Sequence, residues 1–144
     1  MGWADLHALR PNRAQILVVD DDLRIRKALL RALVELGHSV RVAASAEEAD
    51  QWLASERFHL ALLDIDLPRM SGVEFLSWAL KRDAEMAVIM VTGHDEVELA
   101  AQCMTAGART YLVKPIVMEF LAAAINDALA LRQLLISYND RQGL

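Results

Sequence analysis

Short apolar runs alternate along the chain with longer amphipathic segments. The runs have the length and the apolar, often β-branched content of strands. The five candidates are QILVVD (15–20), SVRVA (39–43), HLALLD (59–64), AVIMVT (87–92) and TYLVK (110–114). The first, third and fourth are apolar almost throughout, which is typical of strands in a parallel sheet that is covered on both faces.

The segments between these runs show the 3.6-residue spacing of helices. In the first segment the apolar positions recur at helical intervals, and Gly37 then supplies a stop at its end. The second segment opens on Ser45 followed three positions later by Glu48, which is the pattern of a capping box. The predicted helices span 23–36, 45–56, 72–82, 95–107 and 117–135.

The strict alternation of strands and helices predicts one α/β domain of the (βα)5 type. Right-handed crossovers place helices on both faces of a doubly wound, five-stranded parallel sheet. Ligands of such sheets bind at the edge where the strands have their carboxyl ends. We expect the domain to occupy residues 14–133, with a loosely attached lead-in at 1–13 and a helix end and tail at 134–144.

Composition and charge narrow the class of protein. With 144 residues and 55% hydrophobic content, the chain is long and apolar enough to bury a core, which excludes disorder. The single cysteine, Cys103, excludes an internal disulfide, fits a reducing cytoplasm and is expected to be buried. The net charge of −5 and the lack of a basic cluster argue against direct nucleic-acid binding. No uninterrupted apolar run approaches the roughly 20 residues of a membrane span, and the N-terminus lacks a signal-peptide pattern.

Polar side chains follow four of the five predicted strands at the point where each strand ends. They are Asp20, Asp21 and Asp22 after the first strand, Asp64 at the third, Thr92 at the fourth and Lys114 at the fifth. One polar residue at a strand end means little, because loops are polar. Acids, a hydroxyl and an amine delivered to one sheet edge are hard to explain as solvated loops, and they predict a site.

The three consecutive carboxylates 20–22 need a physical explanation. Like charges repel, and partial burial makes each carboxyl harder to ionise. A hydrated divalent cation would relieve both problems. The alternative is an acidic loop whose last residue caps a helix, and we assign that capping role to Asp22 alone.

Four motifs carry a resemblance to a known family. VVDD (18–21), LLDIDLPRMSG (62–72), VTGHD (91–95) and YLVKP (111–115), in this order and spacing, closely resemble the receiver domain of bacterial two-component response regulators. The resemblance covers roughly residues 14–133. It implies a flavodoxin-like fold with strand order 2-1-3-4-5. It also implies a cytoplasmic signalling switch, rather than an enzyme, that takes a phosphoryl group from a sensor histidine kinase or a phosphotransfer protein.

The resemblance assigns roles to the residues that match its motifs. It makes Asp64 the phospho-acceptor, Asp20 and Asp21 the acidic pair that binds a divalent metal, Thr92 the switch hydroxyl and Lys114 the amine that contacts the phosphoryl group. Phosphoryl transfer requires mainly positioning and neutralisation of charge, which these side chains supply.

Mg²⁺ or Mn²⁺ is the expected cofactor, because hard divalent cations prefer oxygen ligands. The expected ligands are Asp21, Asp64 and the backbone carbonyl of Asp66, and Asp20 is expected to hold a ligating water. These assignments explain why the carboxylates tolerate one another.

Five further positions are candidates for a modulatory role. Gly93 leaves the site uncovered, and Tyr111 matches the family's rotating aromatic residue, although an ordinary strand tyrosine fits as well. Pro115 fits a cis peptide bond that the resemblance implies, whereas base rates favour trans. Asp66 is an additional carboxylate beside the site. It and His94 either face one another across the site mouth, controlling the approach of water, or both point into solvent.

Two other functions stay open at this point. DIDLP (64–68) echoes the D-x-D motif of haloacid-dehalogenase-type phosphatases, although Pro68 stands where threonine is usual. A pseudo-receiver scaffold that never takes phosphate is the other alternative.

The chain is either a stand-alone regulator or the receiver part of a longer protein. The surface of 95–107, 110–114 and 117–135, which corresponds to the α4-β5-α5 face of the family, is expected to carry the partner contact, including a homodimer.

Overall fold

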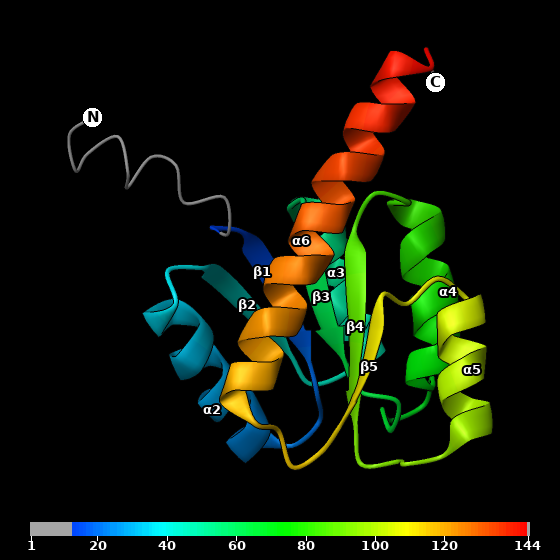
Figure 1. Cartoon of the computed structure of the whole chain (residues 1–144). Helices are drawn as coiled ribbons and strands as arrows, with labels where there is room; N and C mark the ends of the chain where they lie inside the picture. Colours follow the sequence, from blue (N-terminus) through cyan, green and yellow to red (C-terminus); the bar gives the residue numbers. More distant parts are fainter. Residues whose placement is uncertain (1–12, 144) are drawn as a thin grey trace.

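The computed structural model describes residues 13–143 and contains a five-stranded sheet between two layers of helices (Figure 1). The predicted lead-in at 1–13 lies outside the described residues except for Arg13. In the described part the elements are β1 (Gln15–Val19), α2 (Leu23–Glu35), β2 (Ser39–Ala43), α3 (Ala46–Ser55), β3 (Leu60–Leu63), α4 (Gly72–Arg82), β4 (Ala87–Thr92), α5 (Val97–Thr105), β5 (Thr110–Val113) and α6 (Met118–Arg141).

The sheet is parallel throughout, with the order β2-β1-β3-β4-β5. This confirms the predicted doubly wound (βα)5 fold and its 2-1-3-4-5 order. The register pairs Val19 with Leu63 and Leu63 with Met90, so β1, β3 and β4 end side by side. Their carboxyl ends therefore form one edge of the sheet, as the sequence predicts.

Alternating side chains of the central strands build two separate cores. In β1, Ile16 and Val18 pack in the cluster under α2 and α6, whereas Leu17 and Val19 pack in the cluster under α3, α4 and α5. All four side chains are at most 1% exposed. Since successive side chains of a strand point to opposite faces, a strand covered on both sides must be apolar at every position. This requirement accounts for the near-continuous apolar runs.

The helix caps follow the sequence signals. Asp22 accepts a hydrogen bond from the backbone N–H two residues on (2.9 Å), which confirms its capping role and lowers the pKa of its carboxyl. Ser45 accepts one from the N–H of Glu48 at 3.2 Å. The Glu48 carboxylate returns to the N–H of Ala44 (2.8 Å), one residue earlier than in the standard capping box.

Helix α6 is longer than predicted. Its 24 residues continue to Arg141, and at 1.5 Å per residue they span about 36 Å. The N-terminal half packs on the sheet through the fully buried Leu121 and Ile125, and the C-terminal half projects past the sheet (Figure 1).

By length and composition alone, α6 is long and apolar enough to cross a membrane, and it is the one such helix among residues 13–143. The sequence expectation considered uninterrupted runs, whereas a helical window tolerates a few charges. Only 17% of this apolar window is buried, and the buried residues lie in the first half of the helix.

Gly72 fixes how closely α4 approaches the end of β3. A Cβ atom at this position would lie 2.0 Å from the backbone oxygen of Asp64 and 2.6 Å from the Cα of Ile65. The Gly72 N–H also donates to the Ile65 carbonyl at 2.7 Å. A glycine is needed here because two backbones are in contact, and not because of a special φ angle.

We predict that Gly72→Ala lowers the free energy of unfolding by about 2 kcal/mol or more, because the neighbouring backbone must move. Chemical denaturation monitored by far-ultraviolet circular dichroism measures the change. Gly93→Ala is the matched control, because an added Cβ there meets no atom within 4 Å. Equal stabilities for the two variants would contradict the close-contact interpretation.

Candidate functional site

The predicted polar residues lie together at the carboxyl edge of the sheet. Asp20, Asp64 and Lys114 each follow the last residue of a strand, β1, β3 and β5, and Thr92 is the last residue of β4. Regular strand geometry holds the preceding residues in place, and the turn that follows lets each side chain face the edge. The site is therefore positioned by the sheet and closed by loops.

A lysine and two buried carboxylates form the centre of the site. The ammonium Nζ of Lys114 lies 2.6 Å from Asp20 Oδ2 and 3.2 Å from Asp64 Oδ2. Asp20 is 2% and Asp64 5% exposed. Buried charges are tolerated when they are paired and hydrogen-bonded. Lys114 supplies one positive charge to both acids.

The single positive charge of Lys114 does not fully compensate the negative charges of Asp20 and Asp64. Burial, and then the charge of Asp20, raise the pKa of the Asp64 carboxyl, while Lys114 acts in the opposite direction. Burial acts to lower the pKa of Lys114, but the hydrogen bond to Asp20 and the charges of both carboxylates outweigh it and raise that pKa. The ionised group of three carries an excess negative charge, and it attracts a cation.

The geometry of the carboxylates fits a divalent metal. One oxygen from each of Asp20, Asp21 and Asp64 can be chosen so that all three lie within 4.8 Å of one another. Asp21 is exposed, so the cluster is open to solvent on its side. Several carboxylate oxygens with access for water are the ligand set that Mg²⁺ takes in proteins.

Backbone groups orient the two buried carboxylates. The N–H of Asp22 donates to Asp20 Oδ1 at 2.9 Å, and the N–H of Asp66 donates to Asp64 Oδ1 at 3.3 Å. Arg26 donates from its guanidinium to the backbone carbonyl of Asp20 at 2.8 Å. The two bonds from backbone N–H groups engage the Oδ1 atoms, whereas Lys114 contacts the Oδ2 atoms.

Thr92 reaches the same edge but has a different partner. It is fully buried, and its hydroxyl oxygen accepts a hydrogen bond from the N–H of His94 at 3.4 Å. The next residue, Gly93, is exposed and has open space around its Cα. The loop after β4 therefore leaves the mouth of the site uncovered at this position.

His94 and Asp66 face one another, which decides between the two sequence-based alternatives. The ring Nε2 lies 2.9 Å from Oδ1 and 2.8 Å from Oδ2 of Asp66, and the ring Nδ1 lies 3.4 Å from Glu96. The hydrogen bond to Asp66 and then the Asp66 charge raise the pKa of the imidazole. The ring is therefore protonated to higher pH than an isolated histidine.

Tyr111 and Pro115 complete the predicted set. The Tyr111 hydroxyl donates to the backbone carbonyl of His94 at 2.7 Å, and so links β5 to the loop after β4. The Lys114–Pro115 peptide bond is cis, as the resemblance implies. Sequence reasoning did not foresee the contact of Glu96 with His94, nor the contact of Arg26 with Asp20, because neither residue belongs to a motif.

Comparisons with known proteins point to one family. A family model described as the response regulator receiver domain matches residues 16–126. The C4-dicarboxylate transport transcriptional regulatory protein DctD of Pseudomonas aeruginosa is 33% identical over 124 residues, which are 86% of this chain and 27% of that protein. The chain thus spans less than a third of the length of this curated relative.

Solved structures agree in fold. A CheY-like receiver domain protein from Methanospirillum hungatei JF-1 is 37% identical, with a TM-score of 0.80 over 84% of this chain and 97% of the other. NtrX from Brucella abortus, solved in complex with ATP, is 32% identical, with a TM-score of 0.84 over 88% of this chain and 29% of the other. The chain belongs to the family of response regulator receiver domains.

Proposed function

We propose that this receiver domain is a phosphorylation-activated switch whose acceptor is Asp64. The observation that carries the proposal is the position of this carboxylate. It is buried, hydrogen-bonded to Lys114, and within 4.8 Å of two further acidic ligands beneath an open mouth. An acid placed in this way combines a nucleophile with a site for the cation that phosphoryl transfer requires.

The phosphoryl donor is a phosphohistidine of a sensor histidine kinase or of a phosphotransfer protein. A carboxylate oxygen of Asp64 forms a bond to phosphorus as the bond between phosphorus and the histidine nitrogen breaks, which yields an aspartyl phosphate and a free imidazole. Lys114 contacts the phosphoryl oxygens as a compact cation, and the Thr92 hydroxyl donates a hydrogen bond to one of them. The space at Gly93 admits the donor.

Mg²⁺, or Mn²⁺, is the proposed cofactor, and when bound it neutralises negative charge on the transferring group. Asp21, Asp64 and the backbone carbonyl of Asp66 would hold it directly, with Asp20 holding a ligating water. The carboxylate cluster supports this ligand set.

The proposed domain is a cytoplasmic switch and not an enzyme that turns over a substrate. In a phosphatase of the D-x-D type the second Asp would be the acid–base group beside the nucleophile. The side chain of Asp66 is instead paired with His94 at 2.8 Å. A pseudo-receiver would not need the intact acceptor, hydroxyl and amine at 64, 92 and 114. Both alternatives are therefore less favoured by the geometry.

The proposed partner surface consists of α5, β5 and α6, which correspond to the predicted α4-β5-α5 face. Six of the fourteen exposed large apolar side chains in the described part of the chain lie between residues 97 and 120, including Val97 at 87% and Phe120 at 68% exposure. Apolar exposure of this extent is typical of protein–protein contact. A second copy of the domain is the proposed partner, and direct nucleic-acid binding is not proposed.

We predict that acetyl phosphate with Mg²⁺ adds one phosphoryl group to the wild-type chain and none to Asp64→Asn, because only the acceptor carboxylate forms the aspartyl phosphate. Intact-protein mass spectrometry under acidic conditions measures the mass. Asp66→Asn, which changes a neighbouring carboxylate outside the acceptor position, is expected to retain the gain. Phosphorylation of Asp64→Asn to the same extent, or steady turnover of an aryl phosphate by the wild type, would refute the proposed switch.

We predict that Asp21→Asn weakens Mg²⁺ binding by at least about tenfold, since it removes a charged ligand from the cluster. Isothermal titration calorimetry without phosphate measures the affinity. Asp22→Asn is the matched control: it changes the neighbouring carboxylate, and asparagine is an equally good helix cap. Equal Mg²⁺ affinity in Asp21→Asn and the wild type would argue against the site.

We predict that His94→Ala shortens the half-life of the aspartyl phosphate several-fold, because the His94–Asp66 pair narrows the approach of water to Asp64. Because the pKa of His94 is raised, the pair stays charged below that pKa and weakens as the pH rises through it. Wild-type hydrolysis therefore accelerates near and above neutrality, whereas the variant loses this pH dependence. Loss of the phosphoryl group over time is measured at pH 6 to 8. Asp95→Ala is the control, and a wild-type half-life in His94→Ala would refute the role.

We predict that phosphorylation shifts the chain toward a dimer and that Phe120→Ser weakens this dimer by about tenfold or more, because it removes an exposed apolar anchor. Light scattering over a concentration series gives the dissociation constant. Val34→Ser, at a 53% exposed position on α2, is the control outside the proposed surface. A strictly monomeric phosphorylated wild type would remove the dimer from the proposal.

A further inference from the structure

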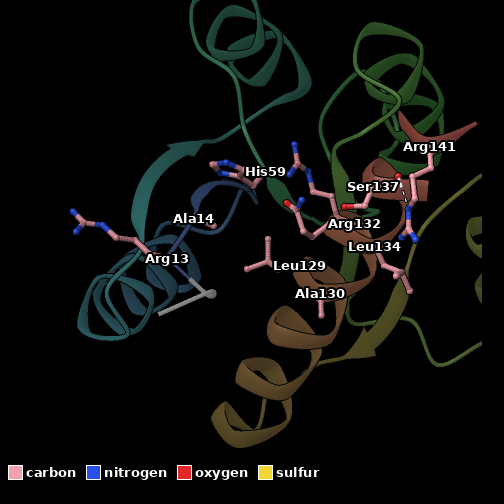
Figure 2. A pocket seen from close by; sticks show the side chains of 10 residues that line it. Arg13, Ala14, His59, Leu129, Ala130, Arg132, Leu134, Ser137 and Arg141 are labelled. Atoms are coloured by element: carbon pink, nitrogen blue, oxygen red, sulfur yellow. Dashed lines mark hydrogen bonds between the residues drawn. The ribbon is translucent and has the colours of Figure 1, made fainter. Parts of the chain in front are cut away.

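A second cavity, of about 660 Å³, lies at the end of the sheet opposite to Asp64. Figure 2 shows the residues that line it. It is bounded by the residue before β1, the residue before β3 and the projecting half of α6. His59 precedes β3 and Asp64 follows it, so the length of this strand separates the two sites. The volume falls in the range of small-molecule sites.

The lining of this cavity is basic, although the chain as a whole carries a net charge of −5. Arg13 comes from the segment before β1, and Arg132 and Arg141 come from α6. None of the described residues that line the cavity is acidic. A concentration of positive charge without carboxylates in a hollow favours an anion.

Arg132 is the central residue of the cavity. Its Nε is shielded from solvent and has no hydrogen-bond partner, which within residues 13–143 is otherwise true only of the Nε of Arg109. No carboxylate of the described residues lies within 4.0 Å of the Arg132 guanidinium. Figure 2 shows its side chain extending from α6 toward His59. Buried polar atoms without a partner are few in folded proteins. Its guanidinium is not committed to a carboxylate, so the terminal N–H groups can donate to a ligand in the cavity.

His59 adds a second donor. Its Nδ1 accepts a hydrogen bond from the backbone N–H of Gln15 at 2.9 Å, so the proton of the neutral ring lies on Nε2. Burial, and then the charges of Arg132 and Arg57, lower the pKa of this imidazole and favour the neutral ring. The ring therefore presents a fixed N–H donor beside Arg132.

The remaining lining is mixed. Leu129, Ala130 and Leu134 supply apolar surface, Ser137 supplies a hydroxyl, and the Nε of Arg141 donates to the Ser137 carbonyl at 3.4 Å (dashed in Figure 2). Arginine forks match the oxygens of a phosphate, and the leucines suit a flat apolar group. A ligand that combines the two features would use the whole surface.

We infer that this cavity binds a phosphate-bearing small molecule of about the size of a nucleoside diphosphate, with Arg132 and His59 holding the phosphates and Leu129 and Leu134 contacting the organic part. The inference goes beyond phosphorylation of Asp64, because it concerns a different ligand at the opposite end of the sheet. It also requires no metal.

Isothermal titration calorimetry of the full chain in EDTA tests the site, with ADP, pyrophosphate and adenosine as probes. EDTA removes divalent cations, so that binding of an anion through the Asp20–Asp21–Asp64 cluster does not contribute. We expect ADP to bind most tightly, pyrophosphate more weakly and adenosine not measurably, with weaker binding at higher salt. Arg132→Gln should lower the affinity by about tenfold or more.

Two controls separate this site from the rest of the molecule. Arg31→Gln removes an exposed arginine of α2 that is paired with Glu35, and it should leave ADP binding unchanged. Asp64→Asn should also leave it unchanged, so that failure of the proposed phosphorylation and failure of this site are distinguishable. No measurable ADP binding to the wild type, or wild-type affinity in Arg132→Gln, would overturn the inference. Binding of an acidic peptide but not of ADP would overturn it in favour of a protein partner.

Discussion

Lys114 reaches from the end of β5 to the carboxylates that follow β1 and β3, and the remainder of the acceptor site depends on this buried contact. Asp20 and Asp64 precede Lys114 by 94 and 50 positions in the chain. Without the lysine, two acids that are at most 5% exposed would be held together with no internal cation. The fold therefore has to bring three strand ends to one edge before the site can exist, and the parallel order of the sheet does so.

Much of this arrangement could be predicted from the sequence because its causes are local or periodic. Strands buried on both faces must be apolar at every position, so β1, β3 and β4 were evident as continuous runs. A cap needs a short polar side chain, so Asp22 and Ser45 were recognisable. Once the parallel fold was inferred, the polar residues after each strand had to meet.

Other features depend on distances that no pattern in the chain encodes. The extension of α6 to Arg141 rests on residues that project past the sheet, where the core no longer sets the apolar spacing. The facing of His94 and Asp66 depends on how two loops approach each other. The second cavity combines residues near positions 13, 59 and 132, and their shared feature, a lack of acidic neighbours, appears only in three dimensions.

The additional carboxylate two residues after the acceptor illustrates how geometry changes the meaning of a sequence. In the sequence Asp66 adds a negative charge to a site that already has an excess of it. In the structure its side chain is turned to His94, while its backbone N–H donates to Asp64. The residue thus offers its polar backbone to the acceptor and places its charge beside an imidazole at the mouth. Since the imidazole carries the compensating charge when protonated, Asp66 adds less to the repulsion within the carboxylate cluster than its position in the sequence suggests.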